Sequence, residues 1–86
     1  MKYEVKLSKR AYRELDSLDL SLRQRILDKL EELQEDPFPR GAVKLQGTES
    51  SYRVRVGDYR ILYDVLNKEG LVLINKIDHR STVYGP

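Results

Sequence analysis

Residues 52–65 constrain the fold of this chain more than any other stretch, because they form two alternating segments joined by a tight turn. The Gly57-Asp58 pair between the segments is typical of the two-residue loop that closes a β-hairpin. Such a loop sets four pairs of residues opposite one another: Val56 and Tyr59, Arg55 and Arg60, Val54 and Ile61, and Arg53 and Leu62. The sequence therefore predicts an antiparallel hairpin whose own turn fixes its register.

Alternation divides this hairpin into an apolar face and a basic face. The basic face holds Arg53, Arg55 and Arg60, which we expect to be exposed. Directly opposed arginines repel unless an anion lies between them, and the planar guanidinium group suits two-point contact with phosphate. The two strands carry no acidic residue on this face before Asp64. The pattern favours an anion site, and the alternative is an ordinary solvated face of charged side chains.

Length and composition narrow the class of protein. We expect a single domain over residues 1–86, too small for a deep pocket and better matched to a polymer than to a small metabolite. The absence of cysteine excludes thiol catalysis and thiolate metal sites. No long apolar run and no signal-peptide pattern is present, so we expect a cytoplasmic protein without a membrane partner.

Charge is distributed unevenly along the chain. Residues 1–37 hold eight basic and nine acidic side chains, whereas residues 38–86 hold eight basic and five acidic ones. The positive excess therefore lies in the part that contains the hairpin, which indicates a polyanionic partner.

The segment before the hairpin predicts a short strand over residues 3–7 and two helices. Ser8 is placed to cap the first helix, and Ser21 with Gln24 forms a capping-box pattern for the second. Pro37 ends the second helix because it lacks an N–H and disfavours helical geometry in the preceding residue.

The segment after the hairpin predicts a turn over residues 67–70 and a last strand over residues 71–77. The apolar residues of this strand do not alternate, so we expect it to be central and covered on both faces. The whole pattern predicts an α+β fold with an N-terminal strand, an antiparallel helix pair and then a three- to four-stranded antiparallel sheet.

The last part of the chain brings three chemically versatile residues together: His79, Arg80 and Tyr84. If the last strand pairs with the second strand of the hairpin, its end could place them near the basic face. The alternative is that His79 is an ordinary surface residue and that Tyr84 packs against the helices.

Taken together, these stretches resemble the RelE/ParE superfamily of bacterial and archaeal toxins. The matching residues are Lys44-Leu45-Gln46-Gly47, residues 52–63 with their Gly-Asp-Tyr-Arg-Ile-Leu-Tyr run, Ile77-Asp78-His79-Arg80, and Val83-Tyr84. The resemblance extends over nearly the whole chain and implies the RelE-like microbial ribonuclease fold. RelE-like members cleave messenger RNA in the ribosomal A site without a metal or cofactor, by attack of the ribose 2′-hydroxyl on the adjacent phosphate.

The resemblance also implies roles for individual residues. Arg53 and Arg55 would bind the RNA backbone together with Lys44, and Arg60 and Arg80 would stabilise the transition-state phosphate. Tyr84 would stack on a base or act as the general base, with His79 as a second candidate for acid–base catalysis. The implied partners are a RelB-like antitoxin, which would form a hetero-oligomer with the toxin, and the ribosome with its message.

One departure from the family pattern concerns proton transfer. Arginine occupies both positions 53 and 55, where the family often has lysine, and arginine cannot be deprotonated at working pH. Two other functions also remain open at this point. One is a ParE-like inhibitor of DNA gyrase without nuclease activity, and the other is an inactive module that binds an antitoxin or nucleic acid.

Overall fold

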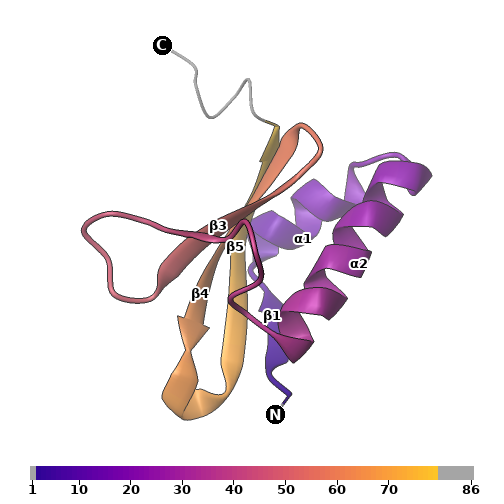
Figure 1. Ribbon diagram of the computed structural model, residues 1–86. Coiled ribbons are helices and arrows are strands. Elements are labelled where there is room, and N and C mark those ends of the chain that lie inside the picture. Colours follow the sequence, from indigo (N-terminus) through magenta and orange to yellow (C-terminus); the bar gives the residue numbers. More distant parts are fainter. Residues whose placement is uncertain (1, 80–86) are drawn as a thin grey trace.

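The computed structural model describes residues 2–79 (Figure 1). The elements follow the chain in the order β1 (Glu4–Leu7), α1 (Lys9–Asp16), α2 (Leu20–Glu35), β2 (Val43–Lys44), β3 (Ser51–Val56), β4 (Tyr59–Leu66), the 3₁₀ turn η1 (Asn67–Glu69) and β5 (Leu71–His79). Figure 1 shows both helices on the same side of the sheet, with the segment between β2 and β3 looping away from them. Neither helix within residues 2–79 is long and apolar enough to cross a membrane.

The strands form one sheet in the order β1-β5-β4-β3-β2. The α+β class is confirmed, but the strand β1 joins the same sheet as a parallel neighbour of β5, so the described sheet has five strands and is mixed. The other neighbouring strands pair antiparallel. Strand β5 lies inside the sheet between β1 and β4, but the prediction that it is covered on both faces is wrong. Leu71 and Leu73 are only half-buried, because the helices cover one face alone.

The helix boundaries follow from local side-chain chemistry. Ser8 caps α1 as predicted, since its side chain accepts a hydrogen bond from the backbone N–H of Ala11 at 3.1 Å. The cap of α2 is Asp19 rather than Ser21, and its carboxylate accepts from the N–H of Leu22 at 2.9 Å. A carboxylate at this position also interacts favourably with the positive end of the helix dipole, which explains why the helix begins earlier than the serine pattern predicts.

The hairpin of β3 and β4 has the register predicted from its turn. All four predicted pairs are present, including Arg55 opposite Arg60 and Val54 opposite Ile61. Gly57 adopts a φ of +59°, which favours glycine, and a Cβ atom there would lie 3.0 Å from the guanidinium group of Arg25. The turn therefore requires glycine for its backbone conformation, and a larger residue there would also displace the flexible end of the Arg25 side chain.

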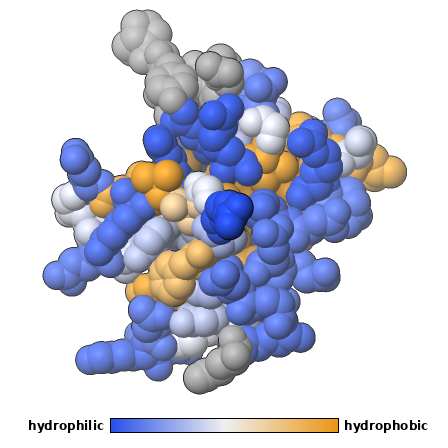
Figure 2. All heavy atoms as spheres, viewed as in Figure 1, coloured by the Kyte–Doolittle hydropathy of each residue, from blue (hydrophilic) through white to orange (hydrophobic). Residues whose placement is uncertain are grey.

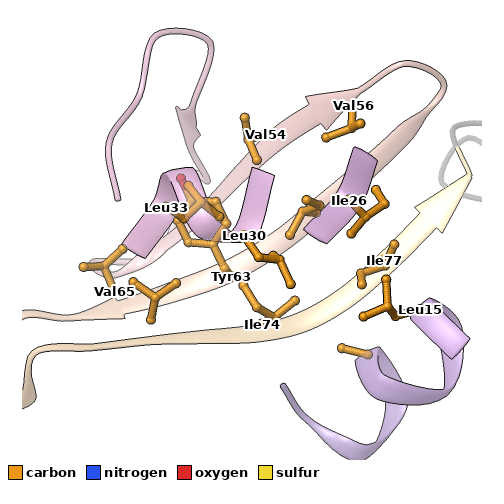
Figure 3. Packing of buried hydrophobic residues seen from close by; sticks show 13 residues of the cluster. Leu15, Ile26, Leu30, Leu33, Val54, Val56, Tyr63, Val65, Ile74 and Ile77 are labelled. Carbon is orange, nitrogen blue, oxygen red and sulfur yellow. The ribbon is translucent and has the colours of Figure 1, made fainter. Parts of the chain in front are cut away.

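The core lies between the helices and the apolar face of the sheet (Figure 3). Side chains of Leu15, Ile26, Leu30 and Leu33 from the helices point toward Val54, Tyr63, Ile74 and Ile77 from the strands. Full burial of one such aliphatic side chain contributes about 1.5–3 kcal/mol. This packing fixes which face of β3, β4 and β5 stays open for other contacts.

Tyr63 ties the segment after α2 to the sheet. Its side chain is fully buried, and its hydroxyl donates to the carbonyl of Pro37 at 2.8 Å. Burial, followed by the effects of Tyr52 and Asp36, raises the pKa of Tyr63 to about 12. The fold therefore favours the protonated hydroxyl.

We expect the stability advantage of Tyr63 over phenylalanine to reverse at high pH. Near pH 8, Tyr63→Phe should lower the free energy of unfolding by about 1 kcal/mol, the usual worth of one hydrogen bond. Because the unfolded tyrosine ionises near pH 10, the wild type should lose about 2–3 kcal/mol of stabilisation as the pH rises from 10 to 12. Urea unfolding of both proteins measures the difference. A constant difference over this range would contradict the prediction.

Candidate active site

The face of β3, β4 and β5 that the helices leave uncovered carries two short rows of residues. The register of the three strands sets these rows side by side, and they consist of Arg55, Arg60 and Asp78 in the first and Arg53, Leu62 and Lys76 in the second. We call these six residues the arginine face. Four of its side chains are cationic and one is a carboxylate, so the surface carries a clear positive excess.

Arg60 differs from the prediction. Its side chain was expected to be exposed with Arg53 and Arg55, but Arg60 is only 5% exposed, while Arg55 is exposed and Arg53 half-buried. Arg60 lies on the middle strand of the three, directly opposite Asp78 of β5, which is 8% exposed. A carboxylate in this position offsets the repulsion between Arg55 and Arg60. The expected anion is thus supplied in part by the protein itself.

Asp78 belongs to a network of charges that reaches α1. Its carboxylate lies 2.8 Å from the ammonium group of Lys76 and 3.9 Å from the guanidinium group of Arg10. Arg10 also contacts Glu14 at 3.2 Å, and Glu14 accepts a hydrogen bond from the backbone N–H of Ile77 at 2.7 Å. Helix α1 therefore fixes the end of β5 beyond the point where β1 stops pairing with it.

Asp64, which shares the uncovered face of β4 with Arg60, is held by neutral donors. Ser51 donates to one of its carboxylate oxygens, and the amide of Asn75 donates to the other at 2.9 Å. Asn75 lies where the pairing of β4 and β5 shifts register. Asp64 is therefore engaged away from the two rows of the arginine face.

Lys44 and His79 share the side of the sheet that carries the core. Lys44 lies opposite Tyr52 on β3 and is exposed at the edge of the sheet. His79 lies opposite Tyr59, and the centres of their rings are 5.1 Å apart in an edge-to-face contact. The structure thus separates both residues from the arginine face, with which the sequence grouped them.

His79 lines a surface cavity of about 320 Å³ between the start of α2 and the hairpin turn. Arg25, Asp58 and Tyr59 line the same cavity. Arg80 and Tyr84, the two remaining candidates, lie outside the described residues.

Sequence reasoning missed Lys76, Asp78 and Leu62 as parts of the site. A signal was present, because Lys76-Ile77-Asp78 alternates and places its two charged side chains on one face of a strand. The register shift between Leu62 and Tyr63 sets the position of β5 against the hairpin, and no sequence pattern predicted this shift.

The arginine face combines four cationic side chains with one carboxylate. In the view of Figure 2, hydrophilic side chains cover most of the molecule and hydrophobic ones form small separate patches. Guanidinium groups arranged in this way can hold a phosphodiester at two points and stabilise the extra negative charge of a pentavalent transition state. The arrangement is suited to binding and positioning a polyanion.

Comparisons with known proteins agree with this fold. A family model described as the ParE toxin of type II toxin–antitoxin systems matches residues 5–84. A Methanocaldococcus jannaschii protein named as a RelE1 toxin is 32% identical over 87 residues, which cover 98% of this chain and 97% of that protein.

Solved structures are similar over almost the same length. RelE in the RelE–RelB complex of Pyrococcus horikoshii matches with a TM-score of 0.83 and 36% identity, covering 93% of this chain and 97% of that one. Isolated RelE from Escherichia coli matches with a TM-score of 0.81 and 28% identity, covering 95% and 90%. This chain therefore belongs to the RelE/ParE superfamily of toxins from type II toxin–antitoxin systems, as a RelE-like member.

Proposed function

We propose that this protein is a ribosome-dependent endoribonuclease that cleaves messenger RNA in the ribosomal A site. The reaction would need no metal: the 2′-hydroxyl of the substrate attacks the adjacent phosphate and leaves a 2′,3′-cyclic phosphate. The observation that supports this proposal best is the arginine face, where Arg53, Arg55 and Arg60 lie in two adjacent rows on an uncovered sheet. The arginine face would supply the phosphate contacts and the positive charge that this reaction requires.

The burial of each arginine suggests a division of roles. Arg55 is exposed and Arg53 half-buried, so both can reach the backbone of an RNA strand. Arg60 is held within the sheet, and a fixed cation suits the stabilisation of charge that develops in the transition state. Arg80 would assist Arg60 in this role.

The position of His79 bears on proton transfer. Its ring packs against Tyr59 on the side of the sheet that faces the helices. Because Arg53 and Arg55 cannot act as bases, we propose Tyr84 as the general base, with stacking on an RNA base as its alternative role. As a base, its pKa would have to fall from about 10.

A RelB-like antitoxin is the partner that we propose for this toxin, as a hetero-oligomer in the cytoplasm. The solved complexes of related RelE proteins with RelB support this assignment. If this proposal holds, the toxin would act on translating ribosomes only when the antitoxin is absent.

The second candidate is inhibition of DNA gyrase, which the match to the ParE family model favours. One experiment separates the two. The toxin is expressed without its antitoxin in a translating extract, message ends are mapped, and supercoiling by gyrase is measured in parallel. For a ribonuclease we expect new message ends within codons at the A site and normal supercoiling. Unchanged messages with blocked supercoiling would reverse the assignment.

A further inference from the structure

We propose that Lys76 is a further phosphate-contacting residue of the arginine face, and that Asp78 is the positioning residue that holds it beside Arg60. This inference rests on the proposed ribonuclease function and adds a residue to its substrate-binding surface. It arises from the placement of β5, which brings a lysine into the second row.

Lys76 lies within reach of a phosphate bound by the arginines. It is opposite Leu62, whereas Asp78 is opposite Arg60, so Lys76 and Arg60 are diagonal neighbours across β4 and β5. Diagonal neighbours in antiparallel strands are about 7–8 Å apart, with their Cβ atoms somewhat closer, and long side chains can span this distance. The ammonium of Lys76 and the guanidinium group of Arg60 can therefore contact the same or adjacent phosphates.

The ammonium group of Lys76 is held but remains accessible. Its Nζ atom is 2.8 Å from Asp78, and the side chain is 34% exposed. An ammonium group has three N–H donors, so one hydrogen bond to Asp78 leaves two that can be directed to a phosphate. A lysine that is already placed loses less conformational entropy on binding than a freely moving one.

Asp78 is fixed more firmly than the lysine it holds. Its side chain is 9% exposed and also faces the guanidinium group of Arg10 at 3.9 Å. The backbone beside it is secured by the hydrogen bond from Ile77 to Glu14. The carboxylate is thus a rigid reference point for Lys76, although its negative charge opposes the approach of phosphate. By holding Lys76 in place, Asp78 should increase the rate of turnover, whereas its negative charge should weaken the binding of RNA.

Variants of Lys76 test the contact directly. The probe is a single-stranded 2′-O-methyl RNA, which lacks the attacking hydroxyl, and its binding is measured over a range of salt concentrations. Lys76→Gln should lower the salt slope by about 0.7 and weaken binding about fivefold at 0.1 M salt, as expected for one lost phosphate contact. Lys76→Arg should keep the slope. Lys68→Gln is the matched control, because Lys68 is an exposed lysine of η1 outside the arginine face, and it should bind as the wild type does.

The isosteric variant Asp78→Asn tests the positioning role. Cleavage of ribosome-bound message should show a lower KM, because a negative charge has been removed, together with a kcat reduced about 10- to 100-fold, because Lys76 and Arg60 are no longer held in place. A purely structural role would not lower KM. If this variant fails to fold, the Lys76 variants still decide the inference.

The results also separate this inference from the proposed function. If the wild type cleaves message and Lys76→Gln has the salt slope of Lys68→Gln, the contact is overturned while the function stands. If Asp78→Asn folds and has wild-type KM and kcat, its positioning role is overturned. A wild type that neither binds the RNA nor cleaves message overturns both proposals.

Discussion

Arg60→Ala should lower the free energy of unfolding by about 3 kcal/mol, whereas Arg55→Ala should change it by less than about 0.5 kcal/mol. The two arginines face each other across the hairpin, but Arg60 is 5% exposed and lies opposite the buried carboxylate of Asp78. Removing its guanidinium group leaves that carboxylate with fewer compensating charges, and a poorly compensated buried charge is costly. Arg55 is exposed, and its removal also relieves repulsion with Arg60.

Urea unfolding of the two alanine variants measures this contrast, with Arg55→Ala as the matched control. The combination of Arg60→Ala with Asp78→Asn should recover part of the lost stability, because the asparagine carries no charge to compensate. Equal stability of the two single variants would show that the buried position of Arg60 contributes nothing to the fold, contrary to this account.

Tyr84→Phe should reduce the rate of message cleavage by about 10²–10⁴, the usual contribution of general acid–base catalysis. This variant keeps the aromatic ring and removes only the hydroxyl, so binding to the ribosome should barely change. His79→Gln should have the milder effect, because His79 lies on the side of the sheet that faces the helices. Single-turnover cleavage of ribosome-bound message, measured over a range of pH, gives both rates.

The results of these variants identify which side chain transfers the proton. Wild-type activity in Tyr84→Phe combined with a loss in Tyr84→Ala would mean that the ring stacks on a base and that its hydroxyl takes no part. A larger loss in His79→Gln than in Tyr84→Phe would contradict the assignment and would make the cavity lined by His79 and Arg25 part of the catalytic centre.

The hairpin prediction succeeds because it depends on local pairing, and the prediction for Arg60 fails because it depends on pairing with a later strand. Pairing between β3 and β4 is local, since Gly57-Asp58 fixes it through the geometry of a two-residue loop, and the predicted register is confirmed. The burial of Arg60 depends instead on β5, which reaches β4 through η1 and a register shift. Alternation cannot locate such a shift, so the partner Asp78 could not be foreseen.

Two further differences between prediction and structure concern the cap of α2 and the position of Lys44. Asp19 and Ser21 both suit the cap of a helix, and the carboxylate two residues earlier prevails. Lys44 was grouped with the arginines by resemblance, yet its pairing with Tyr52 places it on the other side of the sheet. The charge of Asp19 at the start of the helix explains the first difference, and the backbone pairing of β2 with β3 explains the second.

Cleavage by Arg55→Ala is the most direct test of the claim that the arginine face acts on RNA. Arg55 is exposed, so its loss should leave folding intact, and Lys68→Ala removes the same charge away from the face. Each variant is added without antitoxin to a translating extract, and message ends are mapped. We expect A-site cleavage by the wild type and by Lys68→Ala, and none by Arg55→Ala. Cleavage by Arg55→Ala at the wild-type rate would contradict the account.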